Sequence, residues 1–281
     1  MTTLTIFANF FIDTEERFLR MQDSFTSFKS IKSDNWVINI RGKYRLEAMS
    51  FLKNNLGEKL IVYELNSPQG WFYDTKQMLS SINNNYILFW IEDHINLANT
   101  TLLDKIVLEM DKNCLDVMRY SWWCHGIRWK RYQNIKLTHG KYIDYFEQNE
   151  LNNKTIQKNG LSHLISCVMV FKKSLFHKII LTSDQDIENW PKETPFNFEK
   201  KPFDIKWLPV KVALPRQELF ASIDDDAGFK NYCLQSRNLY PTREGRKSYA
   251  VKNYEKKLNF IQQLLKIFIK IKTKIIEKTA K

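Results

Sequence analysis

Glutamate, aspartate and histidine follow one another at residues 92–94, directly after the apolar run of residues 86–91. A short apolar run rich in aromatic and β-branched residues predicts a buried central strand of an α/β sheet. Charged side chains suit such a strand only at its carboxyl end, where open α/β sheets bind their ligands. Carboxylate oxygens beside an imidazole suit a divalent cation and, through it, a diphosphate. The alternative is that Glu92 and Asp93 cap the helix that follows.

The preceding residues predict the elements that would position this triplet. Their apolar patterns indicate strands at residues 4–11, 36–40 and 59–65, and helices at residues 14–28, 46–56 and 71–82. Three strand–helix units followed by a fourth strand predict a mostly parallel sheet with right-handed crossovers. No Gly-x-Gly-x-x-Gly follows the first strand and no Walker A lysine loop occurs, so the sheet needs another way to hold a ligand.

Beyond the triplet the same patterns predict a second group of elements. Strands are expected at residues 115–122, 164–171 and 207–214, and helices at residues 100–110 and 173–180. The polar region between residues 132 and 163 gives no clear pattern.

Composition describes a globular protein, because 43% of the 281 residues are hydrophobic and 14% are aromatic. The four cysteines show no paired spacing, which is typical of thiols in a reducing compartment. Neither a signal peptide nor a long uncharged apolar segment is evident, so the cytoplasm is expected. Nine lysines against two glutamates in residues 252–281 contribute +7 of the net charge of +12. The rest of the chain is only mildly basic, so no nucleic-acid partner is expected.

The basic C-terminal segment predicts a separate amphipathic helix. Residues 253–278 place lysines opposite a wide apolar face, which is typical of a helix lying on an anionic membrane surface. Each lysine near such a surface contributes about 1 kcal/mol. We therefore expect a domain at residues 1–250 and an amphipathic helix at residues 251–281. A helix docked on the domain, or a helical dimer contact, is the alternative.

The element order and the acidic strand end together resemble the GT-A nucleotide-sugar glycosyltransferases that build bacterial surface polysaccharides. Glu92-Asp93-His94 stands where that family has an Asp-x-Asp motif, and residues 66–82 resemble its Asn-x-Gly loop and following helix. The resemblance covers residues 3–225 and implies an α/β, GT-A-like, mostly parallel central sheet flanked by helices. It also implies a divalent cation, Mn²⁺ or Mg²⁺, held by His94 and Glu92. The implied donor contacts are Asn9, Arg41, Gly70, Glu92 and Asp93.

Further carboxylates are needed if the transfer inverts the anomeric centre, because a base must then deprotonate the acceptor hydroxyl. The resemblance points to Glu199 for this role, while pairing with the adjacent lysines is the alternative. Asp225, within an aspartate triplet, is the second candidate, and a solvated acidic turn is its alternative. Acceptor contacts are expected from an aromatic segment and from the same triplet, and core packing explains any one tryptophan equally well: Trp122, Trp123, His125 and Asp224.

These features together predict a cytoplasmic glycosyltransferase, peripheral on the inner face of the cell membrane. It would move a sugar from a nucleotide-diphosphate donor to a glycan or lipid-linked acceptor in surface polysaccharide biosynthesis, for example of lipopolysaccharide. Two other classes stay open. One is a non-catalytic basic adaptor associated with a membrane or a nucleic acid. The other is a metal-dependent phosphoryl-transfer or hydrolytic enzyme.

Overall fold

The computed structural model describes residues 4–119, 132–159, 169–182, 193–194, 207–223, 233–234, 237 and 239–240. The chain divides into two compact units, Met1–Ala221 and Ser222–Lys281. The fold described below is that of the first unit. The expected boundary between residues 250 and 251 stays a prediction.

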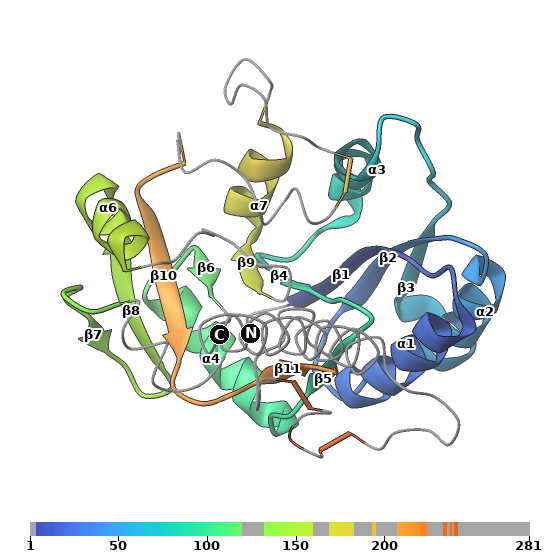
Figure 1. Ribbon diagram of the computed structural model, residues 1–281, viewed down its shortest axis with the longest axis horizontal. Helices are drawn as coiled ribbons and strands as arrows, with labels where there is room; N and C mark the ends of the chain where they lie inside the picture. The colour runs from blue at the N-terminus through green and yellow to red at the C-terminus, as the bar shows by residue number, and fades with distance from the viewer. Residues whose placement is uncertain are drawn as a thin grey trace, which may run out of the picture. The chain divides into compact units, whose positions relative to one another are not determined.

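The first half of this unit is a parallel sheet built from repeated strand–helix units (Figure 1). Its strands lie in the order β3-β2-β1-β4, and each neighbouring pair runs parallel. The helices between them begin where the sequence predicts, and Thr14 caps the first by accepting a hydrogen bond from the backbone N–H of Arg17 at 3.2 Å. The elements are β1 (Leu4–Phe11), α1 (Glu15–Phe28), β2 (Asn35–Arg41), α2 (Arg45–Leu56), β3 (Leu60–Tyr63), α3 (Trp71–Met78) and β4 (Tyr86–Phe89). Short 3₁₀ turns follow α2 at Gly57–Lys59 and α3 at Leu79–Ser81.

The second half continues the same sheet in mixed directions. Strand β9 lies antiparallel between β4 and β6, β10 runs parallel to β6, and β8 and β7 form an antiparallel edge. A separate two-stranded sheet pairs β5 with β11. The elements are β5 (His94–Asn96), α4 (Thr100–Lys112), β6 (Val117–Met118), β7 (Thr138–His139), β8 (Ile143–Gln148), α6 (Glu150–Lys158), β9 (Val170–Lys172), α7 (Lys173–Ile180), β10 (Val210–Pro215) and β11 (Phe220–Ser222).

Helices cover both faces of the sheet, and each face has its own apolar core. The alternation of side chains along β1 shows this, since Ile6 and Ala8 belong to one core and Phe7 to the other. Helices α1, α2 and α4 contribute to the core on the Ile6 face, and α3, α6 and α7 to the core on the Phe7 face. Among the described residues, no helix is long and apolar enough to cross a membrane.

The α/β class with a large central sheet flanked by helices is therefore confirmed. The strand expected at residues 86–91 is shorter, because the chain leaves β4 after Phe89 and Trp90 turns into the core beneath α1. The β7–β8 hairpin and α6 arise from the polar region that gave no clear pattern. Strand β8 was missed because it is buried at Ile143, Asp144, Phe146 and Gln148, which breaks a simple apolar alternation.

Candidate functional site

The carboxyl ends of β1 and β4 form a topological switch point at the edge of the sheet. From β1 the chain builds β2 and β3 on one side, and then returns to place β4 on the other side of β1. Ligands of open α/β sheets bind in the crevice outside the strand ends at such a point. The residues that follow β1 and β4 are therefore the first candidates for a binding site.

The Glu92-Asp93-His94 turn lies directly after β4 and is held against helix α1. The backbone N–H of Trp90 still donates to the carbonyl of Phe7 at 2.8 Å, after which the chain leaves the sheet. The indole Nε1 of Trp90 donates to the hydroxyl of Ser24 at 2.8 Å, and that hydroxyl donates to the carbonyl of His94. This buried serine thus fixes both ends of the turn.

Glu92 has the most unusual environment of the three residues. It is only 8% exposed, and its nearest cationic group is Arg17 Nη1, 3.9 Å from Oε1. Burial, followed by the neighbouring charge of Asp93, raises the pKa of Glu92 to about 7, against the weaker opposing effect of Arg17. A carboxyl group that changes its protonation near neutral pH is typical of a functional site.

Asp93 and His94 form a pair within the same turn. His94 Nδ1 lies 2.7 Å from Asp93 Oδ1. Burial alone would raise the pKa of Asp93, but the charge and hydrogen bond of His94, together with Arg20, lower it below its ordinary value. Because Nδ1 faces the carboxylate, Nε2 is the atom that His94 offers to a ligand.

Asn9 anchors a buried polar network on the α3 face of the sheet. Its amide donates to the hydroxyl of Thr75 at 2.9 Å and to the carbonyl of Trp71 at 3.3 Å. Its side-chain carbonyl accepts from Asn39 at 3.1 Å, and Asn39 also exchanges two hydrogen bonds with the backbone of Leu65. Asn9 is 1% exposed, so the structure places this predicted donor contact where it ties β1, β2 and α3 together.

Gly70 permits a close backbone approach, and the approaching group belongs to the chain itself. Its φ is +90°, and a Cβ at this position would lie 2.6 Å from the Cα of Glu193. The backbone N–H of Trp71 donates to the carbonyl of Glu193 at 3.0 Å. The glycine is therefore needed to bring residue 193 against the start of α3.

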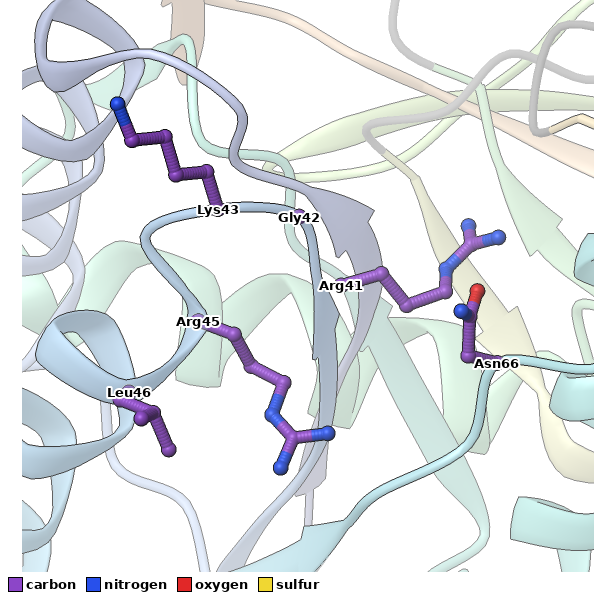
Figure 2. A pocket seen from close by; sticks show the side chains of 6 residues that line it. All are labelled: Arg41, Gly42, Lys43, Arg45, Leu46 and Asn66. Carbon is purple, nitrogen blue, oxygen red and sulfur yellow. The ribbon is translucent and has the colours of Figure 1, made fainter.

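Arg41 ends β2 beside the loop that follows β3. Together with Asn66 it lines an open pocket at the start of α2 (Figure 2). Arg41 and Asn9 lie on the α3 face of the sheet, as the alternation along β1 and β2 requires, whereas the Glu92 turn packs on the α1 face. The predicted donor residues thus lie at the carboxyl ends of neighbouring strands. They form two groups, one on each face of the sheet.

The side chains of the turn at residues 92–94 do not by themselves form a site for the expected divalent cation. Asp93 and His94 are paired with each other, and Glu92 faces Arg17. Within the described ranges, no three histidine, cysteine, aspartate or glutamate side chains gather in a group that could hold a metal ion. The described residues alone therefore do not make a cation site, and cation binding by His94 and Glu92 stays a prediction.

Several predicted residues lie outside the described part of the chain. The two candidate bases, Glu199 and Asp225, belong to this group, as do the acceptor candidates Trp122, Trp123, His125 and Asp224. Their assigned roles stay predictions.

The structure adds residues that the sequence did not single out. Arg17, Ser24 and Asn39 all contact the predicted site residues or hold their backbone. Arg17 lies in the first turn of α1 and also donates to the carbonyl of Phe11 at 3.1 Å, which links the ends of β1 and β4. A serine on the apolar face of α1 and an asparagine inside an apolar strand were the available signals, since buried polar side chains need partners.

Comparisons with known proteins give structural neighbours only. The sequence matches no protein-family model and no curated protein. One neighbour is the crystal structure of S. aureus TarS 1-349, with a TM-score of 0.48, 13% identity, and coverage of 78% of this chain and 60% of that chain. The same fragment in complex with UDP-GlcNAc has a TM-score of 0.45 at 13% identity, covering 78% and 58%.

A third neighbour is the mannosyltransferase PcManGT from Pyrobaculum calidifontis in complex with GDP-Man and Mn²⁺. Its TM-score is 0.45 at 8% identity, covering 76% of this chain and 57% of that chain. The chain thus spans about 60% of the length of these neighbours. UDP-GlcNAc, GDP-Man and Mn²⁺ are ligands of those proteins.

Proposed function

We propose that this chain is a nucleotide-sugar glycosyltransferase of the GT-A type, which transfers a sugar to a glycan or lipid-linked acceptor in surface polysaccharide biosynthesis. The observation that carries the proposal is the position of the Glu92-Asp93-His94 turn. It joins a carboxyl group with a pKa of about 7 to an oriented imidazole at the carboxyl end of β4, beside the switch point. The sequence resemblance supports the same class.

The reaction would break the bond between the anomeric carbon and the donor diphosphate, and form a bond from the acceptor oxygen to that carbon. The acceptor's hydroxyl proton would pass to a carboxylate, for which Glu199 and Asp225 are proposed. Negative charge develops on the departing diphosphate and has to be stabilised. Arg17 and His94 Nε2 are the proposed contacts for this charge, because Arg17 contacts the end of β1 and Glu92, and His94 lies in the turn after β4.

The protonation state of Glu92 would control whether the site repels or binds the donor diphosphate. An ionised Glu92 repels a diphosphate, whereas a protonated Glu92 presents an O–H to a phosphate or ribose oxygen. A pKa of about 7 makes both forms accessible at neutral pH. We further propose that Mn²⁺ or Mg²⁺ accompanies the donor, and that the protein works in the cytoplasm on the inner face of the membrane.

A ligand panel tests the class. We expect one or more donors among nucleoside diphosphates and nucleotide sugars, UDP-GlcNAc and GDP-Man included, to raise the Tm of the full chain, because a ligand that binds the folded state stabilises it by RT ln(1 + [L]/Kd). The panel is run with Mn²⁺, with Mg²⁺ and with EDTA, so that a cation requirement appears as a loss of the shift. No shift with any donor in any of the three conditions would refute the proposal.

A pair of variants tests whether the donor binds at the Glu92-Asp93-His94 turn. His94→Ala should weaken the donor that binds, since it removes the imidazole at the switch point. His139→Ala is the matched control, because the His139 side chain is 65% exposed and lies in the edge strand β7, away from β4 in the sheet. Equal donor shifts in the two variants would move the site away from the turn. Product formation that requires an acceptor then separates sugar transfer from hydrolysis of the donor.

A further inference from the structure

A pocket at the start of helix α2 is built from basic and polar groups. Its volume is about 340 Å³, and it opens beside the last residue of β2 (Figure 2). Among the described residues, those that line it include three cationic side chains and no carboxylate: Arg41, Gly42, Lys43, Arg45, Leu46 and Asn66. A volume near 300 Å³ is at the lower end of the range for small-molecule sites.

Within the described residues, the guanidinium of Arg41 has no hydrogen-bond or ion-pair partner. Its Nε is buried and makes no hydrogen bond, and in the described part of the chain the side chain forms no ion pair. Burial lowers the pKa of Arg41, while the charge of Asp74 acts in the opposite direction from beyond ion-pair distance. An unpaired, partly buried cation is unfavourable unless a ligand supplies the missing contacts.

The rest of the pocket wall adds to the positive potential. Arg45 pairs with the exposed Glu64 at 3.0 Å, outside the group of lining residues. The ammonium of Lys43 lies 5.6 Å from the ring centre of Tyr44, and its chain extends away from Arg41 in Figure 2. Within the described residues, Arg41 is therefore the one of these three cations with neither a carboxylate nor an aromatic ring as its partner.

The backbone at this place also favours an anion. Tyr44 is the N-cap of the twelve-residue helix α2 and makes no side-chain capping hydrogen bond. The positive end of the helix dipole therefore lies at the pocket, next to Leu46. Gly42 has a φ of +100°, and a Cβ there would overlap the carbonyl of Ile12, so the turn that leads from Arg41 to the helix requires glycine.

We propose that this pocket binds a phosphate group, held by Arg41 and Asn66 at the N-terminal end of α2. A guanidinium offers two parallel N–H donors that match phosphate oxygens. The Asn66 side chain lies beside the Arg41 guanidinium in Figure 2 and is exposed, so its amide can add a third donor. The phosphate is either that of a phosphorylated acceptor or one carried by the nucleotide. The site stands on its own geometry and does not depend on sugar transfer.

The test measures stabilisation of the full chain by inorganic phosphate, with sodium chloride at equal ionic strength and pH as the reference. Phosphate should raise the Tm of the wild type above the value in chloride. Arg41→Gln should weaken the apparent affinity at least about tenfold, because a hydrogen-bonded charge contact is lost. Lys53→Gln removes one positive charge from the last turn of the same helix and should change the affinity less than about twofold.

Asn66→Ala is a second variant that should fold, because the side chain is exposed and makes no hydrogen bond within the described residues. It should weaken phosphate binding by about threefold. Arg41→Gln should also fold, since the guanidinium makes no hydrogen bond or ion pair with the residues that the structure describes. Equal stabilisation of wild type and Arg41→Gln by phosphate would overturn the proposal, and so would a wild-type shift no larger than that in chloride.

Addition of UDP distinguishes the two sources of the phosphate. If the shifts produced by UDP and by phosphate add, the pocket serves a phosphate other than that of the nucleotide, which supports an acceptor group. If saturating UDP removes the phosphate effect in the wild type, and Arg41→Gln weakens the shift that UDP itself produces, the nucleotide's phosphate occupies the pocket. Both results support a phosphate site, and neither requires that the donor panel detect a sugar substrate.

Discussion

Replacing Glu92 by glutamine should make the protein more stable above pH 7 and leave its stability almost unchanged in acid. Glu92 is 8% exposed, and burial raises its pKa from 4.5 to about 7. The folded state therefore keeps a proton between pH 4.5 and 7 that the unfolded state has already released. The contribution of Glu92 to the free energy of unfolding of the wild type therefore falls as the pH rises through this window.

The size of the effect follows from the shift in pKa. A rise from 4.5 to about 7 corresponds to about 3 kcal/mol once Glu92 is ionised in both states. Glutamine has nearly the same shape as protonated glutamate and cannot ionise, so Glu92→Gln avoids this cost. The gain should be close to zero below pH 4.5, grow through the window, and level off above pH 7.

The assay is urea unfolding of both proteins at a series of pH values across this range, with the difference in free energy of unfolding plotted against pH. Glu58→Gln is the matched control, because Glu58 is exposed and its carboxylate stays in water. A difference between Glu92→Gln and wild type that does not change with pH would refute the argument. A loss of stability that grows with pH would show that Arg17 stabilises the ionised form more than burial disfavours it.

Three further predictions concern the frame of the site and the C-terminal segment. In urea titrations, Gly70→Ala should lower the free energy of unfolding by about 1–3 kcal/mol more than Gly57→Ala. Both glycines have positive φ, but only a Cβ at Gly70 would meet backbone atoms, which are those of Glu193. Equal losses in the two variants would contradict this. Asn39→Ala should cost about 3 kcal/mol in the same assay, since it leaves the partly buried backbone of Leu65 and the buried Asn9 carbonyl without partners. The exposed Asn55→Ala should cost under about 1 kcal/mol. Deletion of residues 253–281 should release the protein from anionic liposomes in a sedimentation assay, with neutral liposomes as the control, and continued binding would argue against a membrane anchor.

Local patterns predicted most of the first half of the fold. The apolar run at residues 4–11 became β1 with the expected ends, and Thr14 caps α1 as its position indicates. These predictions succeed because the periodicity of a strand and the capping of a helix depend on neighbouring residues only. The second half of the fold was harder to predict, because β6, β7 and β9 are only two or three residues long. Such short strands depend on pairing with neighbouring strands of the sheet and leave little local pattern.

The position of the Glu92-Asp93-His94 turn was predictable for the same reason, whereas its role as a site stays a prediction. An apolar strand that ends in Glu92-Asp93-His94 indicates a ligand edge, and the structure places this turn beside the switch point. The sequence could not show that the Asn9 amide donates its hydrogen bonds to Thr75 and Trp71. Nor could it show that Gly70 is needed for contact with Glu193. Both outcomes depend on partners more than sixty residues away in the chain.

The sequence by itself therefore determined the α/β class, the order of the first four strands along the chain, and the presence of acidic and imidazole groups after β4. Only the tertiary structure decided the ionisation of those groups, because burial against α1 and the distances to Arg17 and His94 set the pKa values of Glu92 and Asp93. It likewise decided that Arg41, at the start of α2, has no ion-pair partner in the described part of the chain. The free energy of a charge depends on the solvent and partners around it, and these are fixed by packing between segments that the chain order keeps far apart.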